Sequence, residues 1–251
     1  MRKGKIIKMR EFASSDVGMM RDMNQDNFYI SGSQDKLKLY ILADGMGGYK
    51  GGEVASAIAI TSAKSYLESN FDSIEHDRVS IQKLIKSAIE YANMIVYEKS
   101  LENEELSGMG TTLEVCLVYG NKAYIGHVGD SRIYRIRKNF IRKLTTDHSY
   151  VETLVKDGTI TKEEAVTHPK KNMLMKAIGC NSYVEPDVMV KGFEKEDILV
   201  ITSDGLTNMV TDEEIYNTIK ENITVATQKL VELANAHGGF DNITVVIIYN
   251  D

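Results

Sequence analysis

The chain has 251 residues, of which 43% are hydrophobic and 26% charged, with a formal net charge of −6 and two cysteines. This composition is typical of a globular protein with its own core, and the acidic balance argues against a nucleic-acid-binding surface. Two cysteines cannot form a disulfide framework, so we expect a protein of a reducing compartment, the cytoplasm. The basic N-terminus lacks the apolar core of a signal peptide, and no apolar run approaches the roughly 18 residues of a membrane span, so we expect neither export nor membrane insertion.

Apolar runs and alternating patterns predict β-strands near both ends of the chain and in its middle. These strands are expected at residues 28–31, 36–43, 111–119, 122–129, 133–136, 197–203 and 242–249.

Helical spacing of apolar residues predicts amphipathic helices over 54–67 and 81–96. A third helix is expected to begin at Thr211, because Glu214 completes a capping box, and a fourth to run from about Thr224 to His237. Between Leu144 and Pro186 only weak helical segments occur, and a segment of this length is often a lid or flap.

Short turns such as 119–122 and 128–132 allow antiparallel hairpins but not parallel crossovers. We therefore predict an α+β fold, in which two antiparallel sheets pack face to face and helix pairs cover the outer faces. Neither a linker nor a repeat interrupts the chain, so residues 1–251 are expected to form one domain.

Residues 41–52, ILADGMGGYKGG, form a glycine-rich loop after a strand. A P-loop would require Gly-Lys-Ser/Thr, which does not occur, and the dinucleotide fingerprint fails because Lys50 takes the place of its last glycine. The remaining interpretation is that Asp44 binds a cation and that the glycines allow backbone or substrate to approach closely.

Further aspartates occur where strands meet turns, and together the set consists of Asp26, Asp44, Asp130, Asp204 and Asp241. Without cations such a cluster would repel itself by roughly 4 kcal/mol per pair at 4 Å and an effective dielectric near 20. Oxygen ligands favour Mg²⁺ or Mn²⁺ over zinc, and two such ions could activate a water for in-line attack on phosphorus. Arg21 offers a planar fork that matches the phosphoryl oxygens of a substrate.

Each of these residues also has a purely structural interpretation. Asp44 and Asp204 occur in Asp-Gly turn pairs, Asp130 could pair with Arg132 in a hairpin, and Asp241 could simply precede a strand. Arg21 could be an exposed turn residue. The number and order of the acids, together with the arginine, favour the metal site.

The pattern resembles that of the metal-dependent serine/threonine protein phosphatases of type 2C, in the small bacterial form. The similar segments are found at 15–30, 41–56, 107–115, 126–136, 144–150, 198–210 and 238–248, in family order and over nearly the whole chain. The resemblance implies a four-layer sandwich with a metal centre at one edge.

The resemblance also implies a role for each matching residue. Asp44 would bridge two metals, the carbonyl of Gly45 would bind one of them, and Asp204 and Asp241 would bind the other; these three acids would be the catalytic ones. Asp26 would lie beside the pair and act partly through water. Asp130 would hold a third, weaker ion together with Asp204. Arg21 would bind the substrate phosphate, and residues 151–172 would form a flap that shapes substrate choice.

One departure from the family concerns the general acid. Many relatives carry a histidine near the Asp-Gly motif, where this chain has Met46 and Tyr49, and His127 and His148 are more typical of structural residues. We leave the acid unassigned and favour metal-bound water. No arginine lies six residues after either cysteine and no Asp-x-Asp pair occurs, so we expect direct attack by water without a covalent intermediate.

These features predict a phosphatase that acts on phosphoserine and phosphothreonine in proteins, with Mn²⁺ or Mg²⁺, and that opposes a membrane-anchored serine/threonine kinase. We expect a monomer without nucleic-acid partners. Two alternatives stay open: a catalytically silent relative that binds a phosphoprotein or kinase, and a hydrolase of small phosphoesters.

Overall fold

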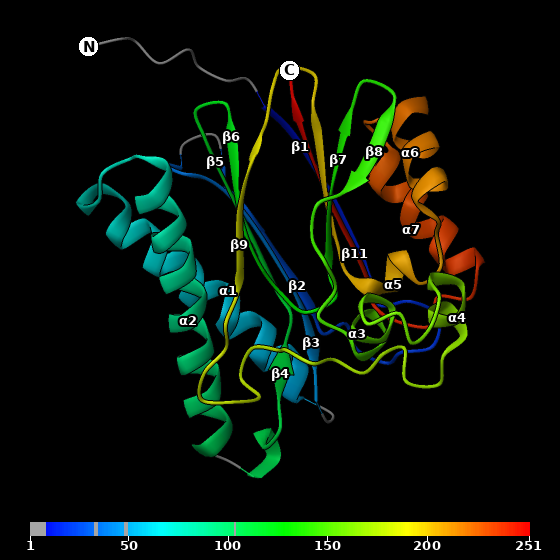
Figure 1. The fold of residues 1–251 in the computed structure, drawn as a ribbon, viewed down its shortest axis with the longest axis horizontal. Helices are drawn as coiled ribbons and strands as arrows, with labels where there is room; N and C mark the ends of the chain where they lie inside the picture. The colour runs from blue at the N-terminus through cyan, green and yellow to red at the C-terminus, as the bar shows by residue number, and fades with distance from the viewer. Residues whose placement is uncertain (1–8, 33–34, 48–49, 103) are drawn as a thin grey trace.

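The computed structural model describes residues 9–32, 35–47, 50–102 and 104–251. Its β-strands form two antiparallel sheets (Figure 1). The first sheet has the order β1-β11-β10-β7-β8, and the second has the order β2-β3-β5-β6-β9 with β4 paired to β3. The strands are β1 Met9–Asp16, β2 Asp26–Ile30, β3 Lys38–Met46, β4 Gly110–Thr111, β5 Leu113–Tyr119, β6 Lys122–Val128, β7 Arg132–Arg137, β8 Phe140–Lys143, β9 Asp187–Gly192, β10 Ile198–Thr202 and β11 Ile243–Asn250.

The helices cover the outer faces of the two sheets, as predicted (Figure 1). On the second sheet lie α1 Gly51–Asn70 and α2 Arg78–Glu102, and on the first sheet lie α6 Asp212–Glu221 and α7 Ala226–Ala236. Short elements complete the fold: η1 Phe71–Ser73, η2 Glu104–Leu106, α3 Tyr150–Lys156, α4 Lys162–Thr167 and α5 Asp204–Thr207. The predicted capping box of Thr211 and Glu214 is present at α6.

Three hydrophobic clusters separate the four layers. One joins α1 and α2 to the second sheet, one joins α6 and α7 to the first sheet, and one lies between the sheets. Strands β10 and β11 face two of these clusters, so nearly every residue in them is buried, which explains their continuous apolar sequences. The predicted α+β sandwich is therefore confirmed.

The two predicted turns differ in outcome. Residues 119–122 form the β5–β6 hairpin, in which Tyr119 pairs with Lys122 and Gly120 has a φ of 59°. Residues 128–132 do not form a hairpin, since β6 and β7 belong to different sheets. The prediction there was wrong: this turn carries the chain from one sheet to the other and places Asp130 at the edge where the sheets meet.

Strands β1, β8 and β9 were not predicted. The β1 sequence, MREFASSD, lacks alternation, and its strand conformation comes from pairing along its full length with β11. The β8 strand has 4 residues, and β9 follows the irregular segment 144–186. In the described ranges no helix is long and apolar enough to cross a membrane.

Candidate active site

The predicted site residues meet at one edge of the sandwich. Asp44 lies in β3, Asp130 follows β6, Asp204 begins α5 directly after β10, and Asp241 precedes β11. Together with Arg21 and Gly45 these acids line a cavity of about 350 Å³. Asp26 is the register partner of Asp44 across the β2–β3 pair. Residues more than 200 positions apart in the sequence thus face one cavity, as the sequence analysis expected.

Burial and mutual repulsion set the electrostatics of this cavity. Burial is the main cause that raises the pKa of Asp26 to about 7, of Asp130 to about 8 and of Asp204 to about 6. The pKa of Asp44 also lies well above its ordinary value, because it is buried and because the other four acids surround it. The cavity therefore concentrates acids whose ionised forms are disfavoured, and among its described acids an ion pair is formed by Asp241, with Arg21.

The donor chemistry of the cavity fits hard divalent cations. Asp26 accepts a hydrogen bond on Oδ2 from Ser203 (2.7 Å), while its buried Oδ1 has no partner among the described residues. The cavity supplies carboxylate and backbone carbonyl oxygens and no cysteine or histidine. As the side chains stand, no group of three or more His, Cys, Asp or Glu residues in the described part of the chain is arranged to hold a metal ion.

Glycine permits the close packing of the loop that carries Asp44. A Cβ at Gly45 would lie 2.2 Å from the carbonyl oxygen of Gly52 and 2.6 Å from that of Gln25. The first turn of α1 can therefore pack directly on the end of β3. Thr112 fixes the other side, since its Oγ1 accepts from the Asp44 amide at 2.9 Å. Tyr49, one of the residues at the expected histidine position, lies outside the described residues.

Arg21 lies at the mouth of the cavity. Its Nη2 donates to Asp241 Oδ2 at 2.8 Å, and the two side chains are 54% and 33% exposed. Sequence reasoning had placed this arginine on the substrate phosphate and Asp241 on a metal. In the structure the two groups pair with each other, which keeps the guanidinium beside the acids.

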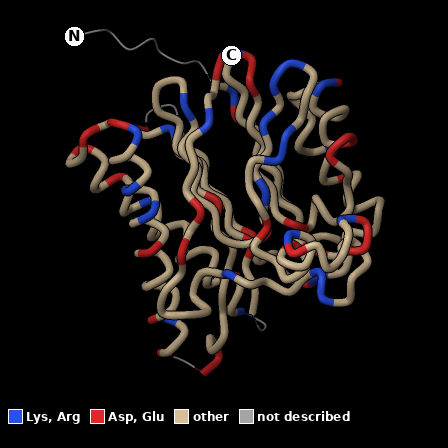
Figure 2. Tube along the Cα trace, viewed as in Figure 1, with Lys and Arg blue, Asp and Glu red and all other residues tan. Residues whose placement is uncertain are grey.

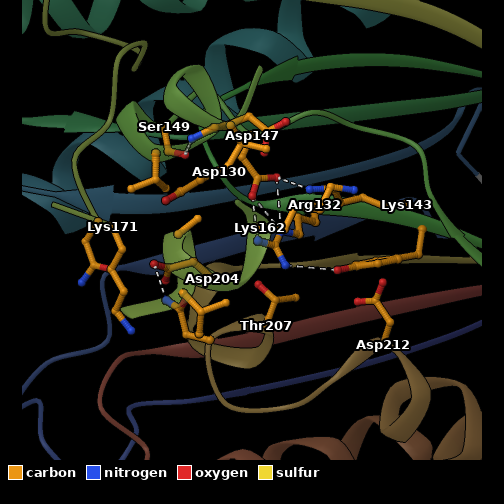
Figure 3. Close-up of a pocket in the computed structure, with 18 residues that line it drawn as sticks. Asp130, Arg132, Lys143, Asp147, Ser149, Lys162, Lys171, Asp204, Thr207 and Asp212 are labelled. Carbon is orange, nitrogen blue, oxygen red and sulfur yellow. Dashed lines mark hydrogen bonds and ion pairs between the residues drawn. The ribbon is translucent and has the colours of Figure 1, made fainter. Parts of the chain in front are cut away.

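The segment predicted as a flap contains the short helices α3 and α4. Both helices have side-chain N-caps, from Ser149 and Thr161. They border a second cavity of about 420 Å³, which adjoins the first because Asp130 and Asp204 line both (Figure 3). Asn172, the last residue of this segment, and Leu174 just after it line the first cavity directly.

Sequence reasoning missed an ion-pair cluster behind Asp130. Arg132 does not pair with Asp130, as the structural interpretation had suggested, but with Asp147 at 2.7 Å, and Lys143 binds the same acid at 3.2 Å (Figure 3). Burial alone would raise the pKa of Asp147, yet the charge and hydrogen bonds of Arg132 hold it below its ordinary value. No local sequence signal announced this cluster, since Lys143 ends strand β8 and Asp147 lies in the irregular stretch after it.

The two histidines that had been weighed as general acids lie outside the cavity. His127 is buried and pairs with the buried Glu114 at 2.5 Å, and its ring stacks on that of His148 at 4.5 Å. His148 Nδ1 accepts from the amide of Gly129 at 3.1 Å. Among the described residues no histidine lines either cavity, and the placement of these two agrees with their structural interpretation.

Comparison with known proteins identifies the class. A family model described as "Protein phosphatase 2C" matches residues 21–235. The chain is 38% identical to protein phosphatase PhpP of Streptococcus pneumoniae, over 93% of this chain and 94% of the other. The fold matches the serine/threonine phosphatase of S. agalactiae with a TM-score of 0.88, 38% identity and coverage of 97% and 100%.

A further match is the catalytic domain of the phosphatase PstP in complex with two manganese ions, with a TM-score of 0.83, 35% identity and coverage of 96% and 97%. The chain therefore belongs to the protein phosphatase 2C family. It is a bacterial serine/threonine phosphoprotein phosphatase of a metal-dependent class, and the expected family, fold and enzyme activity are confirmed.

Proposed function

We propose that this enzyme hydrolyses phosphoserine and phosphothreonine in proteins at the cavity formed by Asp44, Asp130, Asp204 and Asp241, with Mn²⁺ or Mg²⁺ as cofactor. The observation that carries the proposal is the convergence of half-buried carboxylates around one cavity beside an arginine, with the pKa values of Asp44, Asp130 and Asp204 raised. When bound, the two core ions supply an activated water and charge stabilisation for displacement at phosphorus.

The roles of the chain's own residues follow from their positions. Asp44, Asp204, Asp241 and the carbonyl of Gly45 would hold the core ions, and Asp130 with Asp204 would hold a third. Asp26, the neighbour of Asp44 on the adjacent strand β2, would accept a hydrogen bond from a bound water on its unpartnered Oδ1. Arg21 would exchange Asp241 for the substrate phosphoryl oxygens, orient them and stabilise their negative charge. Leu174 and Asn172 would limit access of bulk water from the flap side.

The proposal extends to the setting of the enzyme. Residues 1–251 act as one catalytic domain, with 151–172 as a flap at its active site. The chain works as a monomer in the cytoplasm, and the kinase whose products it reverses is a membrane-anchored serine/threonine kinase.

The direct test is release of phosphate from a phosphothreonine peptide. We expect activity with Mn²⁺ or Mg²⁺ that chelator abolishes and fresh Mn²⁺ restores. Activity that survives chelator would contradict the assignment. A higher kcat/KM on phosphorylated metabolites than on phosphopeptides would instead show a small-phosphoester hydrolase.

A further inference from the structure

A third cavity, lined mainly by cationic side chains, lies on the β7–β8 hairpin, away from the catalytic cavity. The register pairs Arg135 with Arg142 and Arg137 with Phe140, so these four side chains share one face of the hairpin. With Lys138 they line a cavity of about 250 Å³. We name this set, Arg135, Arg137, Lys138, Phe140 and Arg142, the cationic hairpin face. Figure 2 shows its positive charge at the tip of the hairpin.

Ion pairing within the fold does not explain this arrangement, although Arg135 Nη1 donates to the carbonyl oxygen of Gly192 at 3.1 Å. Like charges directly opposite on antiparallel strands are destabilising, and Arg135 faces Arg142. Neither forms an ion pair within the described residues, and Arg135 Nε is buried without a hydrogen-bond partner there. The pKa of Arg135 is lowered by its partial burial and by the neighbouring Arg137 and Arg142. The other face of the hairpin, in contrast, contributes ordinary apolar side chains to the core beneath α6 and α7.

One member of the set has a structural role that must be separated from the rest. Arg137 binds the buried Asp197 at 2.6 Å and the exposed Glu194 at 3.2 Å, so its charge is already compensated. The excess charge therefore resides on Arg135, Lys138 and Arg142. Such an excess is notable in a chain whose net charge is −6.

We propose that the cationic hairpin face binds a phosphate group carried by a polypeptide. Guanidinium forks match phosphate oxygens, and two of them meet here without a carboxylate partner. Phe140, 76% exposed beside them, offers the apolar contact that peptide-binding surfaces use. The site is a cavity with Glu194, the partner of Arg137, beside it, so it suits a single side chain better than a flat anionic bilayer.

The distance to the catalytic cavity defines how the two sites would cooperate. Strand β7 has 6 residues between the turn of Asp130 and the hairpin tip. At about 3.3 Å per residue the two sites are roughly 20 Å apart, which an extended peptide of about eight residues spans. A polypeptide phosphorylated twice would then bind both sites and gain affinity through effective concentration. This cooperative role rests on the proposed function, whereas phosphate binding at the hairpin does not.

The experiment uses the full chain with Mn²⁺ and fluorescein-labelled peptides that carry non-hydrolysable phosphonate analogues of phosphoserine. One peptide has a single phosphonate, and a series has two, separated by spacers of roughly 4, 8 and 12 residues. Fluorescence anisotropy reports the Kd. The test variant is Arg135→Gln/Arg142→Gln, and the matched control is Arg78→Gln/Lys83→Gln, which removes the same charge from exposed positions on α2. Lys138→Gln/Arg142→Gln, at the exposed tip, serves if the first variant does not fold.

We expect the wild type and the control to bind the best double peptide at least about ten-fold more tightly than the single one, and the test variant to lose that gain. All three should bind the single peptide equally. An unchanged gain in the variant would overturn the proposal, and so would the absence of a gain at every spacer in a protein that binds the single peptide at its catalytic cavity. So would a variant that loses only sedimentation with phosphatidylserine vesicles, since that would show a membrane surface. Because the readout is binding, a lack of catalytic turnover would contradict the proposed function without affecting this result.

Discussion

Two buried aspartates, Asp26 and Asp147, show how differently one residue type behaves in this protein. Asp26 and Asp147 are 6% and 8% exposed. The pKa of Asp26 is raised to about 7 by burial, against the hydrogen bond from Ser203, whereas Arg132 and Lys143 hold the pKa of Asp147 below its ordinary value. A buried acid with its own cations is part of the fold. A buried acid without them is available to a cation from outside.

The largest expected effect comes from removing a carboxylate from the catalytic cavity, where the acids have raised pKa values. Asp204→Asn should lower turnover of a phosphothreonine peptide with Mn²⁺ by about 10³-fold, since a charged ligand at the reaction centre is lost. In chelator the variant should be at least as stable as the wild type, because repulsion from Asp241 is relieved. Asp212→Asn, an exposed acid that lines the second cavity, is the matched control and should stay within about three-fold of the wild type. Equal losses in the two variants would refute a special role for Asp204.

The opposite result, a loss of stability, is expected at Asp147, the buried acid that has cationic partners. Arg132→Met should lower the free energy of unfolding by about 3 kcal/mol, because the buried carboxylate of Asp147 keeps only its longer contact with Lys143. Chemical denaturation at pH 7 measures the effect, and Arg132→Met/Asp147→Leu should recover much of the loss.

The pH dependence of that loss checks its cause. The folded-state pKa of Asp147 is depressed, so the pair contributes stability above the ordinary aspartate pKa and loses it as pH falls through the folded-state value. The difference between wild type and Arg132→Met should therefore shrink in acid. A difference that stays constant down to low pH would point to lost packing of the arginine rather than to the ion pair.

A bound divalent cation should stabilise the acids of the catalytic cavity, as Arg132 and Lys143 stabilise Asp147. The pKa values of Asp26, Asp130 and Asp204 are raised, so the chelated protein binds more protons when folded and its stability should fall as pH rises from about 4 to about 8. Mn²⁺ at a hundred times its Kd should add about 2.7 kcal/mol at pH 7 to 8. Thermal unfolding with and without chelator measures both effects. Stability in chelator that rises over this pH range would contradict the raised pKa values.

The same contrast shows what the sequence could reveal. Most strands, the helix pairs and the acids at strand ends were predictable, because periodicity and Asp-turn patterns are local. The partners of these residues were not predictable: Asp147 meets Arg132 at the open end of the β7–β8 hairpin, and β1 becomes a strand only by pairing with β11. The Arg21–Asp241 pair joins the two ends of the chain across 220 positions, so no local pattern announces it.

The smallest effect is expected at Arg21, which pairs with Asp241, the one predicted metal ligand that has a cationic partner among the described residues. Its pair with Asp241 is exposed, so Arg21→Ala should change the free energy of unfolding by less than about 1 kcal/mol. KM for a phosphothreonine peptide should rise by about ten-fold, because the fork that holds the phosphoryl oxygens is lost. Arg21→Lys should recover the charge but not the bidentate contact, and so lie between the two. If instead Arg21→Ala left KM unchanged and lowered stability in chelator, the arginine would be a structural counter-ion of Asp241, and this acid would belong with Asp147.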